Sequence, residues 1–134
     1  SDVVVSTNSV LTSLIWPKLE QIHGSWRLMN NDILVGTHTP VLHTLHAGGV
    51  YVVRNPYLQH RNFTELVYAN FIVVYENANL TFVDMFKWND IGSSAARFDR
   101  FNVSSNPVLE SFLFKASTAV TEVYSLVVLY DNPS

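Results

Sequence analysis

The stretch ELVYANFIVVYENANLTFVDMFKW, residues 65–88, contains two apolar runs that flank the polar tetrad Glu76-Asn77-Ala78-Asn79. Both runs are rich in β-branched and aromatic side chains, which fit the pleated, half-buried surface of a strand. Asparagine tolerates the left-handed backbone that a tight turn needs. The pattern therefore predicts a long central β-hairpin in which the two runs pair across the tetrad.

The composition limits the class of protein. The chain has 134 residues, of which 48% are apolar and 14% are charged, and its formal net charge is −3. This length suits one domain with a sizeable core. The basic residues are scattered, which argues against nucleic-acid binding because phosphate contacts need clustered positive charge. The chain has no cysteine, so disulfides and thiolate metal sites are excluded.

No apolar run approaches the roughly 18 residues of a transmembrane helix, and no signal-peptide pattern is present, so we expect no membrane insertion. Residues 1–9 are interpreted as a linker or lead-in, and residues 10–134 as a single domain. We detect no internal repeat. A helical turn is expected only at Lys18–Gly24.

Turn signals recur about every 8–12 residues, which is the spacing of an all-β sandwich or barrel. Besides the hairpin, strands are expected at residues 10–16, 25–29, 32–35, 41–45, 50–54, 97–103, 109–115 and 122–130. The pattern predicts an all-β, antiparallel two-sheet sandwich of jelly-roll type with about eight to ten strands. An immunoglobulin-like sandwich is the alternative, although the chain lacks the Cys…Trp…Cys pattern.

Three histidines, His38, His43 and His46, lie within nine residues. A bend in this segment would bring them together on a metal ion, but no acidic partner lies nearby in the sequence. We interpret them as surface or core histidines. Asp84 shares a strand face with Phe82 and Phe86, where burial would raise its pKa and suit it to act as a general acid.

A second interpretation of Asp84 is that it faces solvent or a subunit interface, and we prefer this one. No Gly-x-Ser-x-Gly elbow and no phosphate-cradling glycine loop are present. We therefore predict that the chain is not an enzyme and has no catalytic residue, bound metal or cofactor. A hydrolase or metalloenzyme centred on these histidines or on Asp84 is the weaker hypothesis.

The loop from Asn55 to Asn62 combines rings with adaptable polar groups, as recognition surfaces do. Tyr51, Tyr57 and Tyr68 surround it in the sequence. The residues predicted to contact a receptor or ligand are Tyr57, His60, Arg61 and Asn62.

Two segments resemble known jelly rolls. Residues 47–53, AGGVYVV, are similar to the small-Gly-x-Tyr strand of trimeric C1q- and tumour-necrosis-factor-like domains, and residues 123–131, VYSLVVLYD, resemble their final strand. The cysteine-free, charge-poor and Asn/Thr/Ser-rich composition resembles more closely the protruding domains of nodavirus- and tombusvirus-like coat proteins, with fibre heads as a near alternative.

That resemblance implies a capsid surface domain on the virion that forms dimeric or trimeric spikes and attaches to a host-cell receptor or glycan. One alternative is a secreted or cell-surface carbohydrate-binding module or lectin-like sandwich. Another is a trimeric C1q- or tumour-necrosis-factor-like ligand domain, which would be extracellular.

Overall fold

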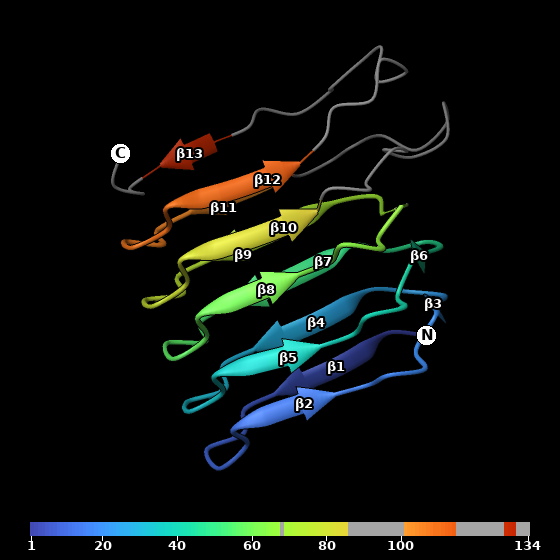
Figure 1. Cartoon of the computed structure of the whole chain (residues 1–134), viewed down its shortest axis with the longest axis horizontal. Helices are drawn as coiled ribbons and strands as arrows, with labels where there is room; N and C mark the ends of the chain where they lie inside the picture. Colours follow the sequence, from blue (N-terminus) through green and yellow to red (C-terminus); the bar gives the residue numbers. More distant parts are fainter. Residues whose placement is uncertain (68, 86–100, 115–127, 131–134) are drawn as a thin grey trace.

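The chain folds into a parallel β-solenoid, in which successive circuits of the backbone stack as rungs (Figure 1). The computed structural model describes residues 1–67, 69–85, 101–114 and 128–130. Within these residues, every strand pair is parallel.

In the described part of the chain, two long sheets and one short sheet make up the solenoid. The six-stranded sheet has the order β1 (Val3–Ser6), β4 (Trp26–Met29), β7 (Val50–Val53), β9 (Ile72–Tyr75), β11 (Phe101–Ser104), β13 (Val128–Tyr130). The five-stranded sheet has the order β12 (Ser111–Phe114), β10 (Phe82–Met85), β8 (His60–Asn62), β5 (Gly36–His38), β2 (Ser13–Ile15). On the third side of the solenoid, β3 (Gln21–Ile22) pairs with β6 (Thr44–Leu45).

The predicted central hairpin is wrong. Its two arms contain β9 and β10, but β9 pairs with β7 and β11, whereas β10 pairs with β8 and β12 in the other long sheet. The polar tetrad turns the chain from one sheet to the next instead of folding it back. The antiparallel jelly-roll sandwich is wrong for the same reason, and so is the immunoglobulin-like alternative, because each strand pairs with its counterpart one circuit away.

The expected absence of an internal repeat is also wrong. At each described corner where the chain leaves the six-stranded sheet, an asparagine is followed three residues later by a leucine. These pairs are Asn8 and Leu11, Asn31 and Leu34, Asn55 and Leu58, Asn77 and Leu80, and Asn106 and Leu109. Successive asparagines are 23, 24, 22 and 29 residues apart. The corner is therefore a repeated Asn-x-x-Leu turn.

The asparagines form a hydrogen-bonded ladder along the solenoid. Each side-chain Nδ2 donates to the Oδ1 of the asparagine in the next rung. The donor and acceptor pairs are Asn8 with Asn31 (2.8 Å), Asn31 with Asn55 (2.9 Å), Asn55 with Asn77 (3.2 Å), and Asn77 with Asn106 (3.1 Å). The ladder therefore joins five consecutive corners, and the last four of these asparagines are fully buried.

The residue before each ladder asparagine has a left-handed backbone. These residues are Thr7, Asn30, Arg54, Glu76 and Ser105, with φ between 53° and 58°. Non-glycine residues rarely adopt this conformation, which costs on the order of 1–3 kcal/mol where it is strained. The ladder bonds hold it in place, because the N–H of Asn55 donates to Asn77 Oδ1 at 3.0 Å.

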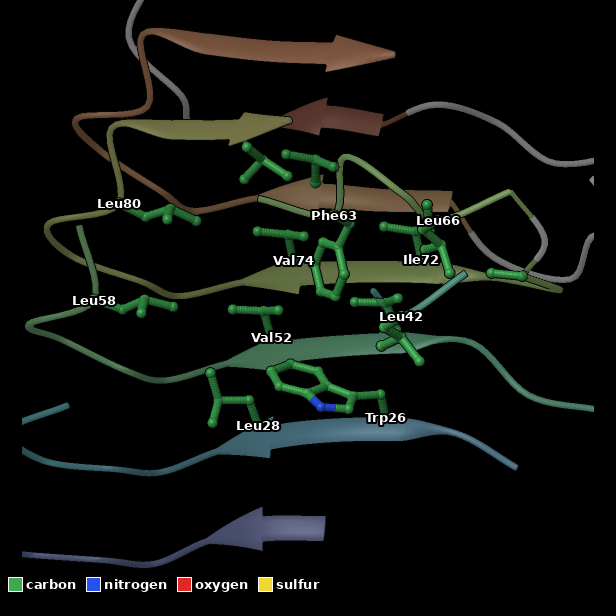
Figure 2. Close-up of a cluster of buried hydrophobic side chains, with 14 of the residues drawn as sticks. Trp26, Leu28, Leu42, Val52, Leu58, Phe63, Leu66, Ile72, Val74 and Leu80 are labelled. Atoms are coloured by element: carbon green, nitrogen blue, oxygen red, sulfur yellow. The ribbon is translucent and has the colours of Figure 1, made fainter. Parts of the chain in front are cut away.

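The core lies between the two long sheets. Strand residues alternate in direction, so Trp26 and Leu28 of β4 point inward, as do Val50 and Val52 of β7. Figure 2 shows how side chains from successive rungs stack in this interior. Each large apolar side chain buried in this way contributes about 1.5–3 kcal/mol, so the core stabilises the stack of rungs.

Several predicted segments differ from the observed elements. The described residues contain no helix, and the predicted helical turn Lys18–Gly24 holds β3 instead. Residues 32–35 belong to an asparagine corner, and β1 lies within residues 1–9. No helix that could cross a membrane occurs in the described part of the chain. The predicted positions 68, 86–88, 97–100, 115, 122–127 and 131 lie outside the described residues.

We expect Asn55→Ala to destabilise the fold by about 3–5 kcal/mol, because it removes several buried hydrogen bonds and leaves their partners unsatisfied. Asn55 Nδ2 donates to the carbonyl of Leu28 at 3.0 Å, and its Oδ1 accepts from Asn31. Urea denaturation measures the loss. The matched control is Asn79→Ala at an exposed corner position, with an expected loss below about 1 kcal/mol. Equal losses would contradict a stabilising role for the ladder.

Candidate functional site

The outer face of the six-stranded sheet is the candidate recognition surface. Its side chains alternate with the inward, core-forming ones, so they point away from the solenoid. We define the outer face by its described outward side chains: Val4, Ser6, Arg27, Met29, Tyr51, Val53, Val73, Tyr75 and Asn102. The parallel register stacks them in two columns that follow the solenoid axis.

The guanidinium of Arg27 organises the first column. Its Nε lies 2.9 Å from a carboxylate oxygen of Asp2, and its Cζ lies 4.7 Å from the ring centroid of Tyr51. Tyr51 in turn makes an edge contact with Phe71, with 4.8 Å between the ring centroids. The backbone N–H of Ser25 donates to Asp2 at 2.8 Å and, together with Arg27, lowers the pKa of the Asp2 carboxyl. The charge of Arg27 is therefore compensated, and the ring of Tyr51 is held in place.

A second charged group lies at the edge of the outer face. Arg54 Nε donates to the carboxylate of Glu76, which also accepts a hydrogen bond from the hydroxyl of Tyr75. These two bonds lower the pKa of Glu76, and the same carboxylate raises the pKa of the Tyr75 hydroxyl. Because Arg54 and Glu76 belong to adjacent rungs and offset each other, they add no net charge to the face.

The asparagine corner next to the outer face exposes a column of apolar side chains. They occupy the second position after each ladder asparagine, and the described members are Val10, Ile33, Tyr57 and Val108. Val10 is 82% exposed and Tyr57 is 55% exposed. Asn79 has the same position in the fourth rung and donates to the carbonyl of Pro56 at 2.7 Å. The corner column therefore extends the apolar character of the outer face around the edge of the solenoid.

The four residues predicted to contact a ligand are not on one surface. Tyr57 belongs to the corner column, and His60 points outward from β8, where its Nδ1 lies 3.3 Å from Thr81 Oγ1. Asn62 ends β8, in register with Asp84, and its side chain lies outside the described part of the structure, as does Tyr68. Arg61 is fully buried.

Arg61 occupies an inward position of β8, in register with Val83 of the next rung. Its guanidinium lies between two core rings, with Cζ 4.4 Å from the centroid of Trp26 and 3.8 Å from that of Phe63. Its Nη2 donates to Thr39 Oγ1 at 2.9 Å. Burial lowers the pKa of Arg61 to about 9. The predicted ligand contact by Arg61 is wrong, because this side chain is part of the core.

A hollow of about 310 Å³ opens on the third side of the solenoid. Glu20, His43 and Glu65 supply polar groups to its wall, and Pro40 and Val41 supply apolar ones. Three consecutive rungs contribute, because the N–H of His43 donates to the carbonyl of Glu20 in the rung before it, and the carbonyl of His43 accepts from the N–H of Val67 in the rung of Glu65. His43 Nδ1 lies 2.8 Å from Thr44 Oγ1, a contact that fixes the ring. The hollow combines acidic, imidazole and apolar groups at one place.

The three clustered histidines separate in the fold. His38 ends β5 in the five-stranded sheet, whereas His43 lines the hollow on the third side. His46 stacks on His23, with 4.9 Å between the ring centroids. Among the residues that the structure describes, no group of three or more His, Cys, Asp and Glu side chains is placed to hold a metal ion. The pairing of His23 with His46 is not predicted by the sequence pattern, in which its only signal is the place of His23 one repeat before His46.

Asp84 lies in β10 and is half-buried on the outward side, since its neighbour Val83 points into the core. It therefore shares a face with Phe82, as the alternation predicted. Phe86 lies outside the described residues. Asp84 stands in register with Asn62, away from the hollow on the third side.

Comparison with protein-family models, with curated proteins and with solved structures gave no match to this chain. Functional inference therefore rests on the three surfaces: the outer face, the corner column and the third side.

We expect Asp2→Asn to reduce stability at neutral pH and to have no effect in strong acid. The folded state lowers the pKa of Asp2, so the stabilisation is present above the ordinary aspartate pKa of about 4 and is lost as pH falls through the folded value. Urea denaturation from pH 7 down to about pH 2 measures the difference between the two proteins. Asp32→Asn, at an exposed corner position, is the control. A difference that persists unchanged in strong acid would contradict this origin.

Proposed function

We propose that this chain is a non-catalytic recognition domain that binds a protein partner with the outer face of its six-stranded sheet. The observation that carries the proposal is the composition of that face, which presents tyrosine, methionine, arginine and valine side chains in flat columns. Tyrosine, methionine and arginine are the residues enriched in protein interfaces, whereas lysine and the acidic residues are depleted.

The electrostatics of the outer face support the same role. Arg27 is its one charged member among the described side chains, and it is already paired with Asp2 and stacked on Tyr51. A partner would therefore cover this face without leaving an uncompensated charge buried, which is the usual penalty at an interface. Because the ring of Tyr51 is held between Arg27 and Phe71, little side-chain freedom is lost on binding.

The size of the outer face indicates how a partner would contact it. Five rungs at about 4.8 Å and four residues at about 3.3 Å give a face of roughly 300 Å² in projection. Standard interfaces bury about 800 Å² per partner. The contact must therefore extend beyond the sheet, and the corner column provides adjoining apolar surface at Val10, Ile33 and Tyr57.

The capsid role expected from the sequence was inferred together with a jelly-roll sandwich, and the solenoid removes that support. The proposed role is therefore attachment, in which the domain is displayed on the surface of a virion or a cell and binds a receptor. Self-association into dimers or trimers would use the same kind of surface, so sedimentation of the free domain belongs to the test.

We expect Val73→Glu to weaken binding to a surface receptor at least tenfold, because a charge would be buried at the centre of the outer face. The measurement is titration of labelled, multimerised domain on cells and on an extracellular-protein array. Ile15→Glu is the matched control, since Ile15 is 63% exposed on the opposite sheet. Equal loss in both variants, or binding unaffected by Val73→Glu, would contradict the proposal.

The hollow on the third side favours glycan binding as a second candidate function. Its volume is at the lower end of small-ligand sites, and its carboxylate and imidazole groups can hydrogen-bond sugar hydroxyls beside an apolar patch. Two glutamates make the hollow acidic, so a neutral or amino sugar suits it better than an acidic one.

If the hollow binds sugar, Glu20→Gln and His43→Ala should each lower glycan-array signals at least tenfold, because each removes a hydrogen-bonding group from its wall. Glu110→Gln, at an exposed position of the asparagine corner, should leave the signals unchanged. An array without any signal for the unmodified chain would remove this candidate and leave the protein-binding proposal untouched.

A further inference from the structure

His23 and His46 occupy equivalent positions in the first two rungs. Gln21 and Ile22 of β3 are in register with Thr44 and Leu45 of β6, which places the two histidines one above the other just beyond these strands. Their ring centroids are 4.9 Å apart and their planes differ by 27°. Both side chains are exposed on the third side of the solenoid.

We propose that His23 and His46 form a two-histidine site for a divalent transition-metal ion such as Zn²⁺. Zinc binds imidazole nitrogen at about 2.0–2.1 Å with tetrahedral geometry, so two imidazoles on one ion have ring centroids roughly 5 Å apart. The observed separation meets this requirement without a movement of the backbone. The stacked rings need only rotate so that one nitrogen of each turns toward the ion, and exposed side chains rotate freely.

The surroundings of the pair favour a cation. Gln21 Oε1 lies 3.1 Å from His46 Nε2, so a neutral oxygen ligand stands beside the site. Glu20 precedes Gln21 on the third side of the solenoid and adds negative charge near the pair. The nearby His43 is not a member of the pair, and its ring is held by the contact with Thr44. The described part of the chain offers no third strong ligand, so water completes the coordination shell and the bound ion exchanges with solvent.

The ligand type sets the metal preference. Imidazole suits zinc, nickel and copper. The affinity of such sites increases from Mn²⁺ through Ni²⁺ to Cu²⁺, and the affinity for Zn²⁺ is lower than that for Cu²⁺. Magnesium and calcium require oxygen ligands, which two histidines do not supply. Because the ligands come from adjacent rungs, the ion would also cross-link the first rung to the second and stabilise the N-terminal end of the solenoid.

The test is calorimetric titration of the whole chain with Zn²⁺ and Ni²⁺ at pH 7.5, together with thermal unfolding with and without metal. We expect saturable one-to-one binding, a higher Tm with metal, and weaker binding at lower pH, because only neutral imidazole coordinates. His23→Ala and His46→Ala should each weaken the affinity at least tenfold and abolish the Tm shift. Both side chains are exposed, so both variants should fold.

His38→Ala and His60→Ala are the controls, since both are exposed histidines outside the pair, and they should bind metal as the unmodified chain does. Three outcomes would overturn the proposal: the absence of saturable binding, binding that survives both substitutions in the pair, or binding by Mg²⁺ and Ca²⁺ with equal strength. Control titrations with Mg²⁺ and with Ca²⁺ test the last outcome.

Discussion

The buried asparagine ladder is the constraint on which the rest of the structure depends. A corner of a β-solenoid turns the backbone sharply, and its peptide groups cannot all bond within one rung. The side chain of Asn55 bonds such groups across rungs: it donates to the carbonyl of Leu28 and to Asn77 Oδ1, and it accepts from Asn31. One side chain therefore connects three rungs. The strained backbone at Arg54 persists because these bonds fix the residue that follows it.

The ladder also fixes which residues face the core. Once the corners stack in register, β1, β4, β7 and β9 begin at equivalent positions, and the first and third residues of each point inward. In the five-stranded sheet, the register gives Arg61 an inward position, which Val83 and Leu14 occupy in other rungs. The rings of Trp26 and Phe63 and the oxygen of Thr39 accommodate its guanidinium there. The fold thus tolerates the guanidinium of Arg61 in the core because aromatic faces and a hydrogen bond replace part of its hydration.

The sequence predicts strands far better than it predicts their partners. The alternation of apolar residues locates β4, β7 and β9, because inward and outward positions obey the same period in parallel and antiparallel sheets. It does not reveal the partner strand, and Asn77 suits a hairpin turn as well as a solenoid corner. The repeat was detectable only as Asn-x-x-Leu at uneven intervals. The polar composition of residues 55–62 is consistent with the exposed position of Tyr57 in the corner column, whereas the burial of Arg61 depends on the partners of β8, which local pattern cannot supply.

The regularity of the fold explains why its candidate sites differ in kind. Where strands continue from rung to rung, as in the six-stranded sheet, outward side chains form flat columns that suit an extended partner. On the third side, β3 and β6 form the only strand pair among the described residues, and turns replace strands in the third rung. There the side chains of Glu20, His43 and Glu65 surround a hollow, and His23 meets His46. Flat columns favour binding of a macromolecule, whereas the irregular side favours small ligands and ions.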